Sequence, residues 1–285
     1  MIATATSGGA HKEVAVFVAG ALCEHGTFYL PLINRLGEDV STVVRPYPIE
    51  TYRGPRDEYQ LADELGAIVD TVTAASAGPV HVVAISGGCT AALLLSVHYP
   101  QRLRSLTLIE PAWLGNHAWH QHEPAFLQRM DSVVNLPVEQ IPRALDRMAS
   151  KYAPAAGPRT RDLLSGSRQQ IIDVQTCWRA WRRAELDWTA LKEVQVPVYL
   201  PVGQHSHPRV VMAAAALHAA FPDAEVETLT GCRHFTVMTA GVAQLAAGVT
   251  RTWRRSRART AAAVGPVSGR GVDPSSPPHR GGRPS

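Results

Sequence analysis

The sequence has no long apolar run and no paired cysteines. No segment reaches the roughly 18 apolar residues that a membrane-spanning helix needs, and the N-terminus has no basic region ahead of a signal-like apolar core. The four cysteines form no C-x-x-C pair, which favours a reducing compartment or plain burial over a disulfide framework: Cys23, Cys89, Cys177 and Cys232. These absences predict a soluble, cytoplasmic protein that does not bind a membrane.

The sequence also has no nucleotide-binding motif, and its basic charge is concentrated at the C-terminal end. Neither a P-loop nor a G-x-G-x-x-G motif occurs, so no nucleotide or dinucleotide cofactor is indicated. The net charge of +4 comes from the C-terminal end, because the segment from Arg254 onward has seven arginines and one acid, or +6, which leaves −2 for the rest. A mildly acidic folded part gives no reason to expect a nucleic-acid partner.

Several histidines raise the question of a metal site, and they are His117, His120, His122, His205 and His207. No carboxylate or cysteine spacing accompanies them in a pattern typical of metal ligands. We therefore expect neither a metal nor any other cofactor.

One stretch, residues 80–95, organises the rest of the chain. Its first half is a β-branched apolar run typical of a strand buried on both faces, and its second half is rich in Ala and Leu and reads as a helix. The chain must turn sharply at Ser86, with the small residues Ala84 and Gly88 two places to either side. This pattern is close to the G-x-S-x-G nucleophile elbow. The alternative is an ordinary serine in a glycine-rich turn between strand and helix.

Strand-like runs and helical patterns alternate along the chain, which predicts an α/β fold with a parallel sheet and helices on both faces. Besides the stretch around Ser86, strands are expected at 14–18, 40–45, 103–109, 196–202 and 225–229. Helices are expected at 28–36, 57–73, 210–221 and 237–253.

Three segments do not fit this alternation. Residues 111–190 have no strand-like run and three helical patterns, so we expect a helical cap inserted after the strand that ends at Glu110. Residues 1–12 are small and polar and predict a flexible N-terminus. Residues 256–285 are rich in Arg, Gly, Pro and Ser and predict a disordered basic tail. The domain itself is expected to span 13–255.

A nucleophilic serine needs a base within hydrogen-bond reach. In the predicted topology the base lies in the loop after the last strand, and His234 is the histidine of that loop. The alternative is an ordinary loop histidine, but the position follows from Ser86.

Taken together, these features resemble the α/β hydrolases, in particular capped esterases, C–C-bond hydrolases and perhydrolase-like enzymes. The resemblance covers about residues 13–253 and rests on the order of five segments: 18–22, 84–88, 106–111, 198–207 and 231–235. It implies a mostly parallel sheet, a Ser–acid–His order along the chain, and an oxyanion hole formed by the backbone N–H groups of Ala21 and Gly87.

The chain departs from the family pattern at the acid. The family usually has an aspartate in the turn after the strand at 196–202, where this chain has Ser206. Relatives similar to haloalkane dehalogenases use a second position, at the end of the strand after the elbow helix, and here that residue is Glu110. We expect the Glu110 carboxylate within hydrogen-bond reach of His234. The alternative is that Glu110 caps or salt-bridges the base of the cap.

Five of the six tryptophans lie in the predicted cap: Trp113, Trp119, Trp178, Trp181 and Trp188. Packing within the cap explains most of them, but aromatic residues over a serine site imply a substrate with an apolar part. The residues expected to contact this substrate are Leu22, Trp113, Trp178, Trp181 and Phe235. Cys89 and Cys232 are expected to be small buried fillers near the site.

The sequence thus predicts a cofactor-free serine hydrolase that cleaves an ester, lactone or thioester through an acyl-enzyme at Ser86. Two alternatives stay open: a lyase or cyclase that uses Ser86 and His234 as acid–base groups, and a ligand-binding protein of the same fold with little or no turnover. The expected partner is a small molecule with an apolar part, and the expected state is a monomer or homodimer.

Overall fold

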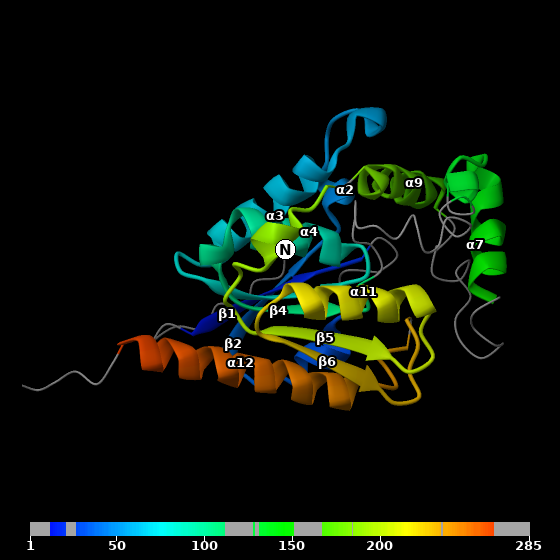
Figure 1. Ribbon diagram of the computed structural model, residues 1–285. Coiled ribbons are helices and arrows are strands. Elements are labelled where there is room, and N and C mark those ends of the chain that lie inside the picture. Colours follow the sequence, from blue (N-terminus) through cyan, green and yellow to red (C-terminus); the bar gives the residue numbers. More distant parts are fainter. Residues whose placement is uncertain are drawn as a thin grey trace, which may run out of the picture.

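The computed structural model describes residues 12–20, 27–111, 128, 131–150, 167–183, 185–234 and 236–264. Within them, six parallel strands form one sheet in the order β2-β1-β3-β4-β5-β6 (Figure 1). The strands are β1 Glu13–Val18, β2 Val40–Arg45, β3 Val80–Ile85, β4 Leu103–Ile109, β5 Val198–Gly203 and β6 Ala224–Leu229. The predicted α/β class and parallel sheet are confirmed.

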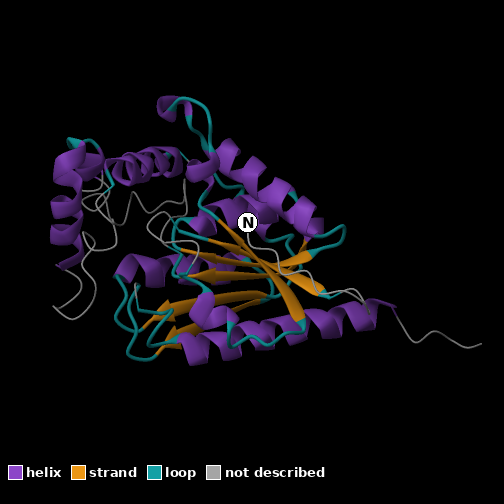
Figure 2. Ribbon diagram, turned by 180° about the vertical axis from the view of Figure 1, so that it is seen from behind, coloured by secondary structure: helices purple, strands orange, loops and turns teal. Residues whose placement is uncertain are grey.

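Helices cover both faces of the sheet, because successive side chains of each buried strand point to opposite sides. Figures 1 and 2 show α3, α4 and α11 on one face and α12 on the other. In β3, Val82 and Ala84 pack in the cluster with α3, α4 and α11, whereas Val83 and Ile85 pack toward α12. The bounds are α1 Leu30–Ile33, α3 Leu61–Ala75, α4 Gly88–His98, α11 Pro208–Ala220 and α12 Val242–Val264.

The remaining described elements lie at the edge of the sheet or in the predicted cap. They are α2 Pro48–Thr51, η1 Arg56–Glu58, η2 Pro100–Arg102, η3 Val138–Gln140, α7 Ile141–Ser150, α9 Arg168–Arg182 and α10 Trp188–Leu191. Figure 1 shows α9 beside α2, with α7 beyond it. No helix in the described part of the chain is long and apolar enough to span a membrane.

The predicted cap boundary at residue 190 is too late. Leu186 and Leu191 are buried in the main hydrophobic core, and Trp188 packs against the same cluster. The short helix α10 therefore belongs to the sheet domain, whereas α9 forms separate clusters with α2 and with the segment before η3. Residues 112–127 and 151–166 of the predicted cap lie outside the described residues.

The prediction of a disordered tail from residue 256 is wrong for residues 256–264. The helix α12 continues through Val264, and it is held by side chains that a search for apolar stripes misses. Ser256 Oγ donates to the Arg104 carbonyl at 2.8 Å, and Arg257 Nε lies 2.6 Å from Glu13 Oε2. Arg259 Nη2 lies 2.8 Å from Asp223 Oδ2. Residues 265–285 lie outside the described residues.

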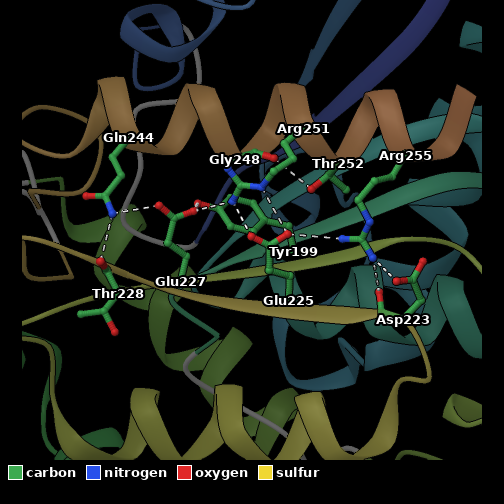
Figure 3. Close-up of polar contacts among 10 residues, drawn as sticks. All are labelled: Tyr199, Asp223, Glu225, Glu227, Thr228, Gln244, Gly248, Arg251, Thr252 and Arg255. Atoms are coloured by element: carbon green, nitrogen blue, oxygen red, sulfur yellow. Dashed lines mark hydrogen bonds and ion pairs between the residues drawn. The ribbon is translucent and has the colours of Figure 1, made fainter. Parts of the chain in front are cut away.

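An ion-pair network fixes α12 on the last two strands (Figure 3). Arg251 bridges Glu225 and Glu227 on β6, and Tyr199 of β5 donates its hydroxyl to Glu227 at 2.8 Å. Gly248 makes this approach possible, because a Cβ there would lie 2.1 Å from Tyr199 Cζ. The network holds β6, and β6 leads directly into the loop that carries His234.

Candidate active site

The turn at Ser86 has the conformation that an elbow requires. Ser86 has a φ of +52°, in the left-handed region that non-glycine residues rarely adopt. Its N–H donates to the Ile109 carbonyl at 3.0 Å, which anchors the turn to β4. A Cβ at Gly88 would lie 2.6 Å from the Ala19 carbonyl oxygen, so glycine is required there. Position 84 does not require glycine, because the methyl group of Ala84 packs in the hydrophobic core.

Three side chains meet at the carboxyl edge of the sheet. His234 Nε2 lies 3.0 Å from Ser86 Oγ, and His234 Nδ1 lies 3.0 Å from Glu110 Oε2. In the tautomer whose Nδ1–H donates to the carboxylate, Nε2 can accept the hydrogen bond from the serine hydroxyl. The predicted contact between Glu110 and His234 is confirmed.

Glu110 uses both carboxylate oxygens. It is fully buried and follows β4 with a φ of +53°, a second left-handed residue at this edge. While Oε2 faces His234, Oε1 accepts from the Ser206 hydroxyl at 2.7 Å and from the Gly203 N–H. Among the described residues, the hydrogen bonds of Glu110 go to His234, Ser206 and Gly203, and the base of the predicted cap at 112–127 lies outside the described residues.

Ser206 therefore stands next to the acid rather than in place of it. The turn in which the resemblance implies an aspartate brings the Ser206 hydroxyl to 2.7 Å from Glu110 Oε1, at the end of β4. Gly203 permits this approach, since a Cβ there would lie 2.7 Å from Ser206 Oγ and from the Cys232 carbonyl oxygen. The loops after β5 and β6 are also joined, because the His205 N–H donates to the Cys232 carbonyl at 2.8 Å.

The two cysteines near the site are buried. Cys89 Sγ donates to the Ile109 carbonyl at 3.5 Å, and Cys232 Sγ donates to the Thr230 carbonyl at 3.3 Å. Burial and the neighbouring Glu110 carboxylate raise the pKa of the Cys232 thiol. A thiol held in its protonated form is a poor nucleophile, which fits the predicted role of a small filler.

The cap helix α9 places an aromatic ring against the elbow. A Cβ on Gly87 would lie 2.0 Å from Trp181 Cη2, so the indole lies directly on the Gly87 backbone. Trp178 is half-buried, and its ring centroid lies 6.1 Å from that of Trp181. Gly87 and Trp181 thus lie in contact beside Ser86, with Trp178 next to Trp181, and their roles in binding stay predictions. Four other predicted site residues lie outside the described residues: Ala21, Leu22, Trp113 and Phe235.

Glu64, a buried carboxylate that contacts the Trp181 indole N–H, was not identified from the sequence. The Glu64 carboxylate on α3 accepts from the Trp181 indole N–H and from the hydroxyls of Tyr47 and Tyr59. The signal was present, because Glu64 lies on the face of α3 that also carries Leu61 and Ile68. A charged residue on an apolar stripe needs partners, and only Tyr59 lies close to Glu64 in the sequence, whereas Tyr47 and Trp181 lie 17 and 117 residues away.

Among the described residues, no group of three or more histidine, cysteine, aspartate or glutamate side chains is arranged to hold a metal ion. Both nitrogens of His234 are used within the site, one toward Ser86 and one toward Glu110. The geometry is one that a nucleophile, a base and an acid that orients the base require.

The comparisons with known proteins rest on structure. No family model matches the sequence, and no curated protein is similar to it in sequence. Among solved structures, MenH from S. aureus is similar with a TM-score of 0.67 at 14% identity, covering 86% of this chain and 95% of that one. MGS-M2, an alpha/beta hydrolase enzyme from a deep-sea metagenome library, is similar with a TM-score of 0.66 at 11% identity, covering 88% and 92%.

A third similar structure comes from a study of carboxylesterases of Nitrososphaera gargenis. Its TM-score is 0.65 at 13% identity, and the match covers 87% of this chain and 93% of that one. At such low identity, these likenesses show the fold.

Proposed function

We propose that this protein, which has the α/β-hydrolase fold, is a cofactor-free serine hydrolase that cleaves an ester, lactone or thioester. The observation that carries the proposal is the continuous hydrogen-bonded chain from Ser86 Oγ through His234 to the buried Glu110, with 3.0 Å at each step. A serine hydroxyl is a weak nucleophile by itself, and a base in this position activates it.

In the proposed acylation step, Ser86 Oγ attacks the acyl carbon while His234 Nε2 takes the hydroxyl proton. His234 then gives this proton to the leaving alcohol or thiol, and an acyl ester at Ser86 remains. In deacylation, His234 takes a proton from water, the hydroxide adds to the acyl carbon, and the proton returns to Ser86 as the acid leaves. No cofactor or oxidant is consumed.

Glu110 has two tasks in this scheme. It holds the His234 ring with Nδ1 protonated, and its charge stabilises the imidazolium that forms at each transfer. The Ser206 hydroxyl and the Gly203 N–H donate to Glu110 Oε1 and fix the orientation of the carboxylate. Ser206 is thus proposed to support the acid, since its own neutral hydroxyl cannot balance a charge.

The oxyanion that forms during acyl transfer needs fixed donors. Gly87 is the N-cap residue of α4, so its backbone lies at the positive end of the helix dipole. We propose its N–H as one donor and the N–H of Ala21 as the other. The Trp181 ring beside Gly87 supplies an apolar wall, which favours substrates with an apolar acyl group.

A panel of p-nitrophenyl esters of increasing acyl length, together with lactones and thioesters, tests the proposal. We expect turnover of at least one apolar member and a loss of about 10⁶-fold in Ser86→Ala. Turnover within about tenfold of wild type in Ser86→Ala would rule out the acyl-enzyme and favour acid–base chemistry of a lyase.

A further inference from the structure

Glu64 is a carboxylate buried in an apolar cluster. It is fully buried, and within the described residues it forms no ion pair. Its Oε1 accepts from Tyr47 OH at 2.9 Å and Tyr59 OH at 3.2 Å, and the Trp181 indole N–H lies 3.1 Å and 3.2 Å from its two oxygens. Burying a carboxylate is costly, so this arrangement needs a reason beyond packing.

The three donors come from separate parts of the chain. Tyr47 precedes α2 and Tyr59 follows η1, whereas Trp181 lies on α9 of the predicted cap. Tyr47 also meets the Trp181 ring edge to face, with centroids 5.9 Å apart. Glu64 therefore connects the sheet domain to the Trp181 indole and fixes the orientation of that ring.

That ring lies against the elbow. The atoms of Trp181 nearest to Gly87 are Cη2 and Cζ2, which belong to the six-membered ring of the indole. An acyl group bound at Ser86, with its oxygen toward the Gly87 N–H, has to lie beside this ring. A small rotation of the indole changes the width available to the acyl group.

We propose that Glu64 is a positioning residue that sets the acyl-group width of the site through the Trp181 indole. This inference rests on the proposed hydrolase function and goes beyond it, because it assigns selectivity to a residue that does not touch the substrate. A carboxylate suits the task because it offers only acceptors to three donors. An amide in its place would turn a donor toward at least one of them.

The protonation state of Glu64 also affects its hydrogen bond with the Trp181 indole N–H. Burial raises the pKa of Glu64 to about 7, against the lowering effect of the hydrogen bonds from Tyr47, Trp181 and Tyr59. Asp63 on the same helix and the Cys177 thiol on α9 also act on this cluster electrostatically. Burial raises the pKa of the Cys177 thiol and of the Tyr47 and Tyr59 hydroxyls, so these three groups stay protonated. Arg56 and Asp173 form an ion pair nearby at 2.9 Å.

The test compares kcat/KM for a narrow and a wide acyl ester, p-nitrophenyl acetate and p-nitrophenyl pivalate. The ratio of the two values cancels every pH effect that the two esters share, because both need the same nucleophile and base. We expect Glu64→Gln to raise the pivalate-to-acetate ratio about tenfold at pH 8. In wild type the same ratio should rise as the pH falls from 8 to 6, and in Glu64→Gln it should stay flat.

Asp173→Asn is the matched control. It breaks the Arg56–Asp173 ion pair, which also ties α9 to η1, and leaves the contacts of Glu64 in place. We expect its ratio to equal that of wild type. A shift in Asp173→Asn as large as in Glu64→Gln would mean that general loosening of α9 sets the width, and the inference would be wrong.

The indole N–H of Trp181 gives a readout that needs no turnover. Its ¹H–¹⁵N resonance, assigned by its loss in Trp181→Phe, should shift with a midpoint near pH 7 in wild type and show no such midpoint in Glu64→Gln. If Glu64→Gln does not fold, Trp181→Phe replaces it in the ester assay, where it should make the ratio independent of pH.

The outcomes separate this inference from the proposed function. Normal ester turnover with an unchanged ratio and a flat indole titration overturns the role of Glu64 alone. Absence of turnover with every ester overturns the proposed function, and the inference falls with it.

Discussion

At the scale of residues, the proposed site has the Glu110 carboxylate at the end of β4 and the Ser206 hydroxyl hydrogen-bonded to it. The sequence indicated both, because Ser206 stood where an acid was expected and Glu110 stood at the next strand end. It did not indicate the contact between them, since the turn at 203–206 and the end of β4 meet only in three dimensions. Glu64 was missed because its contact with Trp181, 117 residues away, forms only in the folded chain.

Glu110→Gln tests the acid. The amide keeps the shape of the side chain but removes the charge, and it can present a donor to His234 Nδ1, so the wrong tautomer faces Ser86. We expect the fold to persist and kcat to fall by roughly 10³ to 10⁴. A loss smaller than tenfold, with circular dichroism unchanged, would show that Glu110 does not orient the base.

Ser206→Ala provides the comparison for Glu110→Gln. The carboxylate keeps its Gly203 N–H donor and its contact with His234 after the hydroxyl is removed. We expect kcat to fall by about tenfold or less, in line with the loss of one hydrogen bond to a charged group. A loss equal to that of Glu110→Gln, measured under the same conditions, would make Ser206 part of the acid itself.

At the scale of elements, strands were predicted well and helix ends poorly. The bounds of β2 and β4 agree with the predicted ranges, because β-branched and apolar runs stop at clear turn residues. α12 extends beyond its predicted end at residue 253, because arginine and alanine favour a helix without marking an apolar stripe. Its partners Glu13 and Asp223 lie far away in the sequence.

The last turns of α12 should contribute to stability. A chain shortened to Arg255 loses the contacts of Ser256, Arg257 and Arg259 with the sheet domain. Partly exposed ion pairs contribute up to about 1 kcal/mol each, so we expect a loss of about 1–2 kcal/mol and a Tm lower by several degrees. A chain shortened to Val264 is the control for differential scanning calorimetry, and equal Tm values for the two would contradict the account.

The elbow glycine offers a second test at this scale. Gly88→Ala places a Cβ 2.6 Å from a backbone oxygen, so the turn has to shift and stability and turnover should both fall. Gly66→Ala on the exposed face of α3 meets nothing within 4 Å and should stabilise by about 0.5–1 kcal/mol. Urea unfolding of the two variants measures both changes, and stabilisation by Gly88→Ala would contradict the close approach.

At the scale of the whole molecule, two buried groups with opposite effects shape the pH dependence of stability. Glu64 binds its proton more tightly in the folded state, since burial raises its pKa from 4.5 to about 7. The protein therefore loses stability as the pH rises through that window. His81 binds its proton less tightly, since burial lowers its pKa from 6.5 to about 4, and stability is gained as the pH rises between these values.

These opposing terms can be separated with Glu64→Gln. The variant has no carboxylate to ionise, so the difference in unfolding free energy between the variant and wild type should move in favour of the variant from pH 4.5 to 7. The expected change is about 3 kcal/mol, from the pKa shift of Glu64. Urea unfolding at several pH values measures it, and a difference that is independent of pH would contradict the raised pKa.

The most direct test of the central claim is covalent labelling of the folded protein with a fluorophosphonate, followed by intact-mass and peptide mass spectrometry. The account predicts one phosphonyl group per chain, located on Ser86, with labelling lost in Ser86→Ala and strongly slowed in Glu110→Gln. A folded wild-type protein that stays unlabelled, or that labels at another residue, would contradict the claim that His234 and Glu110 activate Ser86 as a nucleophile.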